Sequence, residues 1–360
     1  INESILGGTR HRFIAGAEVV NTSSDQDRWN TYWSATADDK ETFFINRPLQ
    51  VLGGVGVNSR GAQTTNDFTV DINDDTRVSI DVYSAFIQDE ISITEKFDVI
   101  LGARFDHFEI DVFNVPANDV SSRTDEEVSP RLGLVYKPVE NMSLYGSYSE
   151  SFLPRSGEQF ANINGSNGQL DPNTFENLEV GFKWDFGSGL SLTAAAFQIQ
   201  QTSPQVADND PSTLDVIETE TDGVEIQLDG QLTDFWYLSA SYTYLDGEQV
   251  GRTGPSGRRP RELPENMFSV WNSFQFSQKF SGGLGLTYQD ESFINNSNSA
   301  VLPSYTRVDA ALYYQLSNTL RIQVNVENLT DTDYYPSSHS THQATVGAPL
   351  NARFAITKDF

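Results

Sequence analysis

The sequence contains no cysteine, which excludes a disulfide framework, a thiolate metal site and a thiol nucleophile. Its four histidines are too few to favour a multi-histidine metal site. No apolar run reaches the roughly 18 residues that a membrane-spanning helix needs. Basic residues are also scarce, because 23 Lys and Arg stand against 50 Asp and Glu, for a formal net charge of -27. This balance argues against nucleic acid as a partner, since phosphate binding requires a basic face.

The length and the ends of the chain leave several organisations open. A chain of 360 residues can form two soluble domains or one large β architecture. Aromatic residues make up 12% of it, more than a disordered acidic chain would carry. The first residues, Ile1 to Ser4, include no initiator methionine, basic region or apolar signal segment. We therefore expect a fragment or a processed product.

Apolar residues recur at every second position over most of the chain. Leu178, Val180 and Phe182 alternate with Glu179, Gly181 and Lys183, and the rhythm resumes after the turn residues 187–189. A period of two indicates strands with one apolar and one polar face, and a glycine-rich break between two such runs indicates a hairpin. The pattern predicts about 14 strands, near residues 10–20, 79–93, 96–111, 126–137, 141–153, 175–186, 189–201, 219–230, 234–248, 265–277, 280–294, 304–316, 318–330 and 350–360.

The predicted connections alternate between short and long. Short ones stand near residues 94–95, 138–140, 187–188, 231–233, 278–279 and 317, and long ones at 21–78, 112–125, 154–174, 202–218, 249–264, 295–303 and 331–349. Tight turns at one end and long loops at the other are typical of a transmembrane antiparallel outer-membrane β-barrel. In such a barrel the Leu178 face meets lipid, and the face of Glu179, Lys183 and Asp185 lines a polar lumen. A soluble β-sandwich or propeller is the alternative, although no blade-length repeat supports a propeller.

Several segments resemble the C-terminal barrel of TonB-dependent siderophore receptors. They stand in the family's order and cover nearly the whole chain outside the long loops: LGARFDHFEI, SPRLGLVYKP, LYGSYSESFLPRSG, FENLEVGFKWDF, LSLTAAAFQI, ETDGVEIQLDG, LSASYTYLDGE, LPSYTRVDAALYYQL and VNVENLTDTDYYPSSH. The resemblance implies a plugged 22-stranded barrel in the outer membrane of a Gram-negative bacterium. Residues 1–360 then form the last 14 or so strands, and the plug, the peptide that engages TonB and about eight strands lie outside this chain.

The resemblance also implies a transporter and not an enzyme, without a cofactor beyond the iron carried in its ligand. Its partners are a ferric siderophore, the TonB-ExbB-ExbD complex, reached through the N-terminal region, and the lipid and lipopolysaccharide of the outer membrane. SYSESFLPRSGEQF and YYPSSHSTHQ are closer to catecholate-type receptors than to ferrichrome-type ones, whose last outer loop carries a cysteine pair. A passive outer-membrane channel and a soluble or surface β protein used for adhesion are the alternatives.

The candidate ligand-binding residues lie in the expected outer loops. An anionic ferric catecholate favours arginines and aromatic faces in a partly dry pocket. Each candidate also has a plainer interpretation, since loop aromatics pack on the barrel rim and loop cations are often only solvated. Asp125, Glu126 and Glu127 form an acidic cluster whose spacing matches no defined Ca²⁺ loop. The candidates are Phe152, Arg155, Phe160, Arg258, Arg259, Tyr334, Tyr335 and His339, and the residues expected to face the lumen include Glu225, Gln227, Asp229, Arg307, Asp309, Arg321 and Glu327.

Overall fold

The computed structural model of the chain describes residues 2–6, 8–29, 56–57, 63–64, 72–115, 117–154, 171–187, 189–206, 214–251, 257–340 and 343–359. These residues form strands, turns and irregular segments. They include no helix that is long and apolar enough to cross a membrane. The all-β prediction is therefore confirmed for the part of the chain that the structure describes.

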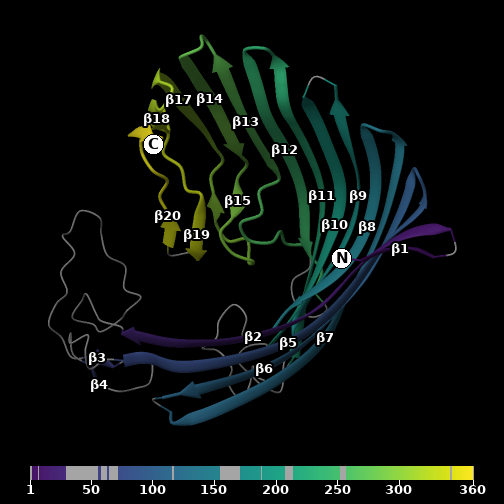
Figure 1. Cartoon of the computed structure of the whole chain (residues 1–360). Helices are drawn as coiled ribbons and strands as arrows, with labels where there is room; N and C mark the ends of the chain where they lie inside the picture. The colour runs from purple at the N-terminus through teal and green to yellow at the C-terminus, as the bar shows by residue number, and fades with distance from the viewer. Residues whose placement is uncertain are drawn as a thin grey trace.

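One antiparallel sheet of 15 strands dominates the structure, and its spatial order follows the chain order. Figure 1 shows these strands side by side in one curved sheet, with β1 at one margin and the C-terminal strand at the other. Its strands are β1 (Asn2–Leu6), β2 (Thr9–Trp29), β5 (Ile72–Thr94), β6 (Phe97–Asn114), β7 (Asp119–Val139), β8 (Met142–Leu153), β9 (Asn173–Phe186), β10 (Leu190–Val206), β11 (Leu214–Thr233), β12 (Trp236–Gln249), β13 (Asn266–Gln275), β14 (Phe280–Gln289), β17 (Tyr305–Ser317), β18 (Leu320–Glu327) and β21 (Asn351–Lys358). Among the described residues no ladder joins β1 to β21, so this sheet is open.

Three small hairpins lie within the long connections. They are β3 (Gly56–Val57) with β4 (Gln63–Thr64), β15 (Ser292–Phe293) with β16 (Val301–Leu302), and β19 (Ser337–Ser340) with β20 (Gln343–Thr345). The longer connections meet at one end of the sheet, which we call the long-loop end. The tight turns before β2, β6, β8, β10, β12, β14 and β18 meet at the other, the short-turn end.

Each of the 14 predicted strands corresponds to a strand of the large sheet, but several details of the prediction were wrong. One is the expected loop 202–218, which loses both ends to β10 and β11. β1 was missed, because five residues are too few to show a period. The expected loop 112–125 is largely strand, since β6 runs to Asn114 and β7 begins at Asp119. The expected loop 21–78 likewise loses both ends to β2 and β5. Much of this added strand is polar, as at residues 21–28 and 121–125, and an apolar-alternation criterion therefore misses it.

The two faces of the sheet differ in chemistry as predicted. On β9, Leu178 is 55% and Val180 57% exposed, and on β21 Phe354 is 65% exposed. No described part of the chain covers this apolar face. The polar face carries Glu179 and Lys183, which stand in register with Ser147 and Ser143 of β8. The ladders also place on the polar face every residue expected to line a lumen: Glu225, Gln227, Asp229, Arg307, Asp309, Arg321 and Glu327.

Aromatic rings gather near the short-turn end. The Trp236 and Phe274 ring centroids are 6.0 Å apart, those of Phe274 and Phe276 6.1 Å, and those of Phe276 and Phe280 5.3 Å. A band of aromatic side chains beside an exposed apolar face is typical of strands that cross a bilayer, because such rings favour the interface.

Candidate ligand-binding site

Three long connections build a packed loop cluster at the long-loop end, made of residues 257–265, 290–304, 328–340 and 343–350. Figure 1 shows β15, β19 and β20 of this cluster at the end opposite the short turns that join β11 to β12 and β13 to β14. A ligand that approaches this end of the sheet meets the cluster first. It is therefore the candidate site, and its internal contacts decide which side chains are available.

Reciprocal hydrogen bonds join the first two loops. The Arg259 backbone N–H donates to Asn298 Oδ1 at 2.9 Å, and Asn298 Nδ2 donates to the Arg259 carbonyl at 2.8 Å. The Gln249 side chain, in a residue only 6% exposed, donates to the carbonyls of Arg259 and Asn296, both at 3.1 Å. Asn298 has φ 54°, a left-handed conformation that asparagine tolerates better than most residues. The two loops are thus fixed to each other through backbone groups.

Glu262 ties the first loop to the third. Its carboxylate accepts hydrogen bonds from the backbone N–H and the hydroxyl of Ser338, and Arg261 donates both to this carboxylate at 2.9 Å and to the Ser338 carbonyl at 2.8 Å. Glu262 itself has φ 54°, unusual for a residue with a long side chain. Burial raises the pKa of Glu262, but the Ser338 and Arg261 contacts outweigh it and hold the pKa below its usual 4.5. The carboxylate is therefore charged at neutral pH.

Tyr334 anchors the third loop onto the sheet. It is 6% exposed, its ring lies 4.8 Å from the Tyr305 ring, and its hydroxyl accepts a 3.2 Å hydrogen bond from Arg307. A Cβ at Gly347 would lie 2.3 Å from the Tyr334 ring, so only glycine permits this close packing. The contacts of Tyr334 that the structure describes are within the chain, and its contact with a ligand stays a prediction.

Asn328 is the main residue of this region that sequence reasoning missed as a structural element. It is fully buried, with φ 52°. Its amide donates to the carbonyls of Thr332 and Ala348 at 2.9 and 3.0 Å and accepts from the Thr332 N–H at 2.9 Å. These bonds close the turn that leaves β18. The signal that could have found this turn is the pair Asn328 and Asp331, since both residue types favour turns and both adopt positive φ here.

Only some of the predicted ligand-binding residues lie in the loop cluster, and their contacts differ. Arg259 is largely engaged inside the protein, since it donates to Glu265 at 2.9 Å and to the Leu245 carbonyl at 3.0 Å. Arg258 is half-buried and makes no ion pair with any described residue. Phe152 lies outside the cluster, with its ring packed edge-on against Phe108 at 5.4 Å. Tyr335 is half-buried beside Tyr334, His339 is described only as part of β19, and Arg155 and Phe160 lie outside the described residues.

Several charges on the polar face of the sheet are paired with a charge of opposite sign. Arg104 donates through Nε to Asp106 at 2.9 Å and through its terminal nitrogen to Glu18 at 3.0 Å and Ser84 at 2.8 Å. Arg307 pairs with Asp309 at 2.9 Å. Further along the wall, Lys137 reaches Asp98 at 2.7 Å. Such pairs keep a polar wall hydrated without a strong net field.

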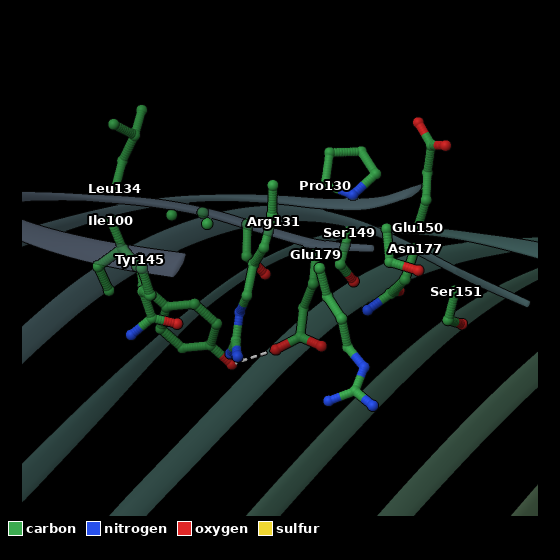
Figure 2. Close-up of a pocket in the computed structure, with 18 of the residues that line it drawn as sticks. Ile100, Pro130, Arg131, Leu134, Tyr145, Ser149, Glu150, Ser151, Asn177 and Glu179 are labelled. Atoms are coloured by element: carbon green, nitrogen blue, oxygen red, sulfur yellow. Dashed lines mark hydrogen bonds between the residues drawn. The ribbon is translucent and has the colours of Figure 1, made fainter. Parts of the chain in front are cut away.

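A hollow of about 970 Å³ opens on the polar face over β5 to β9. Figure 2 shows Arg131, Tyr145 and Glu179 projecting from the sheet to the same side, while Leu134 points away on the other side. The Tyr145 hydroxyl donates to Glu179 Oε1 at 2.6 Å. This hollow is a second concave surface, separate from the loop cluster.

Comparison with known proteins gives one family for most of the sheet. Residues 5–329 match the family model described as "TonB dependent receptor-like, beta-barrel". The chain is 29% identical over 374 residues to the probable TonB-dependent siderophore receptor PiuA of Acinetobacter baumannii, covering 97% of this chain and 50% of that protein. It is 31% identical over 275 residues to the ferrioxamine B receptor of Salmonella typhimurium, covering 73% of this chain and 38% of that protein.

Solved structures agree with this result. The crystal structure of PiuA superimposes with a TM-score of 0.82 at 26% identity, over 99% of this chain and 54% of that one. The ferric-catecholate import receptor Fiu of Escherichia coli K12, in its closed form, gives a TM-score of 0.77 at 20% identity, over 99% of this chain and 53% of that one. At this identity the likeness to Fiu concerns the fold alone. The chain spans about half the length of the relatives and solved structures named here, or less.

Proposed function

Because this chain belongs to the TonB-dependent receptor β-barrel family and lies in the outer membrane of Gram-negative bacteria, we propose that its protein binds a ferric siderophore at the cell surface and imports it. The expectation that the chain is no enzyme agrees with this family of transporters. The loop cluster is the receptor surface in this proposal, and the polar face lines the path of the ligand. The apolar face meets lipid.

The observation that carries the proposal is the packed loop cluster on one end of a two-faced sheet. A passive pore needs only a polar lumen, and loose loops would suffice around its mouth. Here hydrogen bonds between three loops hold Arg258, Tyr335 and β19 on one rigid surface. Preorganisation of this kind favours binding, because less conformational entropy is lost when a ligand is captured.

We further propose that the chelate is a catecholate, and that energy for import comes from the inner membrane through TonB, ExbB and ExbD. The Arg258 guanidinium has no ion-pair partner among the described residues, and a guanidinium suits the anionic oxygens of a ferric catecholate. The named relatives differ in their ligands, since one is a ferrioxamine B receptor and another imports ferric catecholates. Catecholate over hydroxamate is thus the finer hypothesis. The other proposed contacts are Phe152, Arg155, Phe160, Arg259, Tyr334, Tyr335 and His339.

The test is uptake of radio-iron by iron-starved cells that carry the native gene, with a deletion strain as control. The iron is supplied as a triscatecholate complex and, separately, as the desferrioxamine B complex. Gene-dependent uptake that stops with a protonophore is expected. Uptake that persists with the protonophore would mean a passive pore. Gene-dependent uptake of the hydroxamate complex alone would overturn the catecholate assignment, and uptake of neither complex would overturn siderophore import by this protein.

A further inference from the structure

We propose that the hollow on the polar face is an anion-binding station, where Arg131 and Lys183 hold the phenolate oxygens of a ferric catecholate on its way through the lumen. This inference rests on the proposed function and assigns a second place of contact, far along the chain from the loop cluster. It concerns the wall of β7, β8 and β9, where Arg131 and Lys183 line the hollow together with Glu179.

Small residues create the recess. Gly133 stands opposite Ser147 and Gly181 opposite Tyr145 in the ladders. A Cβ at Gly181 would lie 2.6 Å from the Ala194 carbonyl oxygen and 2.7 Å from the Tyr145 ring. Glycine at this position therefore lets the Tyr145 ring lie flat across β9 and reach Glu179. The result is a shallow floor of glycines and serines with long side chains around it.

Two of the cations that line the hollow have no ion-pair partner among the described residues, as is also the case for Arg10 and Arg321 elsewhere on the polar face. Arg104, Lys137 and Arg307 each contact a carboxylate at 3.0 Å or less. Arg131 and Lys183 are exposed, and neither forms an ion pair with a residue that the structure describes. Unpaired cations on a wall keep their full attraction for a passing anion, whereas paired ones have largely lost it.

Tyr145 shapes the recess for an aromatic anion. Its hydroxyl occupies one oxygen of Glu179 at 2.6 Å, which holds that carboxylate against the ring and reduces its repulsion of a ligand. Lys183 Nζ stands 5.9 Å from the Tyr145 ring centroid. A catechol ring that stacks on Tyr145 would thus place its oxygens near the ammonium group, with the hydroxyls of Ser147 and Ser149 as further donors.

The charge of the whole chain explains why such a station would be needed. With a net charge of -27, the protein repels an anionic complex over distances of about a Debye length. A local pair of unneutralised cations lowers this barrier inside the lumen. The expected signature is a change in transport with little change in surface binding, because the recess lies away from the loops.

The experiment uses the native protein in its outer membrane, with the variant R131Q/K183Q. The matched control is R77Q, which removes an exposed cation from the apolar side of β5. Radio-iron triscatecholate is bound to de-energised cells to give Kd, and uptake is then measured in energised cells. We expect Kd to change by less than about twofold and the uptake rate to fall about five- to tenfold in R131Q/K183Q alone. The single variant R131K is expected to retain most of the rate.

The outcomes separate this inference from the proposed function. Wild-type uptake with an unchanged rate in R131Q/K183Q would overturn the station and leave siderophore import in place. An equal loss of binding and uptake would also overturn it, since the hollow would then support the loops or dock another segment of the protein. Absence of wild-type uptake of any ferric chelate would overturn the proposed function, and the station with it. An equal loss of ferrioxamine B uptake in the variant would refute selection by anionic charge.

Discussion

Removal of the Glu262 carboxylate should weaken the contact between the first and third loops, because Ser338 donates to this carboxylate. In Glu262→Ala the Ser338 backbone N–H, in a residue 6% exposed, loses its acceptor. An unsatisfied buried donor costs about 1–3 kcal/mol. The lost ion pair adds little, because the Arg261 side chain is 41% exposed. The left-handed backbone, at φ 54°, is as unfavourable for alanine as for glutamate, so no strain is relieved.

The expected result is local opening of the β19–β20 hairpin. At 1.36 kcal/mol for each tenfold change, the loss corresponds to about 5- to 150-fold faster amide exchange in peptides that cover Ser337–Ser340 and Gln343–Thr345. Glu262→Gln keeps an acceptor oxygen and should accelerate exchange only about two- to fivefold. The readout is hydrogen–deuterium exchange by mass spectrometry on the native protein, because global unfolding of a large sheet would not report one contact.

A matched variant and a pH series test whether the Glu262 carboxylate stabilises the β19–β20 hairpin. Glu291→Ala removes an exposed carboxylate from the neighbouring loop and should leave the hairpin unchanged. The pKa of Glu262 is lowered in the folded protein, so its stabilisation is complete above the usual pKa of 4.5 and is lost as the pH falls through the lowered pKa. Exchange corrected for its intrinsic rate should therefore rise only below about pH 4.5. Equal exchange in Glu262→Ala and Glu291→Ala would refute the assigned role.

Three further predictions concern single side chains. Asn328→Ala removes three side-chain hydrogen bonds and leaves alanine in a left-handed turn, so it should loosen the third loop by about 3–5 kcal/mol, seen as faster proteolysis between residues 328 and 350. Gly283→Ala places a Cβ 2.3 Å from the Trp271 ring, so we expect a shifted tryptophan emission and a destabilisation of about 1–3 kcal/mol. His339→Ala should weaken chelate binding by about 1 kcal/mol or more if it is an anchor, and an unchanged Kd in a tryptophan-quenching titration would remove it from the site.

Most of the sheet could be predicted from the sequence, because a strand between lipid and a polar lumen must alternate at every position. Leu178 and Glu179 cannot exchange faces without placing a carboxylate in hydrocarbon. Where β2 and β7 extend past this constraint, residues 21–28 and 121–125 are all polar, so no apolar alternation marks them as strand.

The loop cluster could not be predicted, since its order depends on partners far apart in the sequence. Glu262 and Ser338 are 76 residues apart, and Arg259 and Asn298 are 39 apart. Composition indicates a basic patch at 258–261, but it cannot show that Arg259 is engaged by Glu265 and the Leu245 carbonyl while Arg258 has no ion pair among the described residues. In the same way, the absence of an ion pair between Arg131 or Lys183 and any described residue depends on which side chains the neighbouring strands carry.

The sequential order of the large sheet has a consequence for how the chain assembles. Every strand in it pairs with its nearest predecessor and successor of the same sheet, so each new ladder closes only one loop. Loop-closure entropy is then lost in small steps. Folding can begin with hairpins at several places along the chain, and neighbouring hairpins can then pair with one another. A break in one long connection, such as that between β10 and β11, removes no ladder partner. The chain can therefore be divided there into two pieces that each retain their own internal strand pairs and a complementary edge for the other.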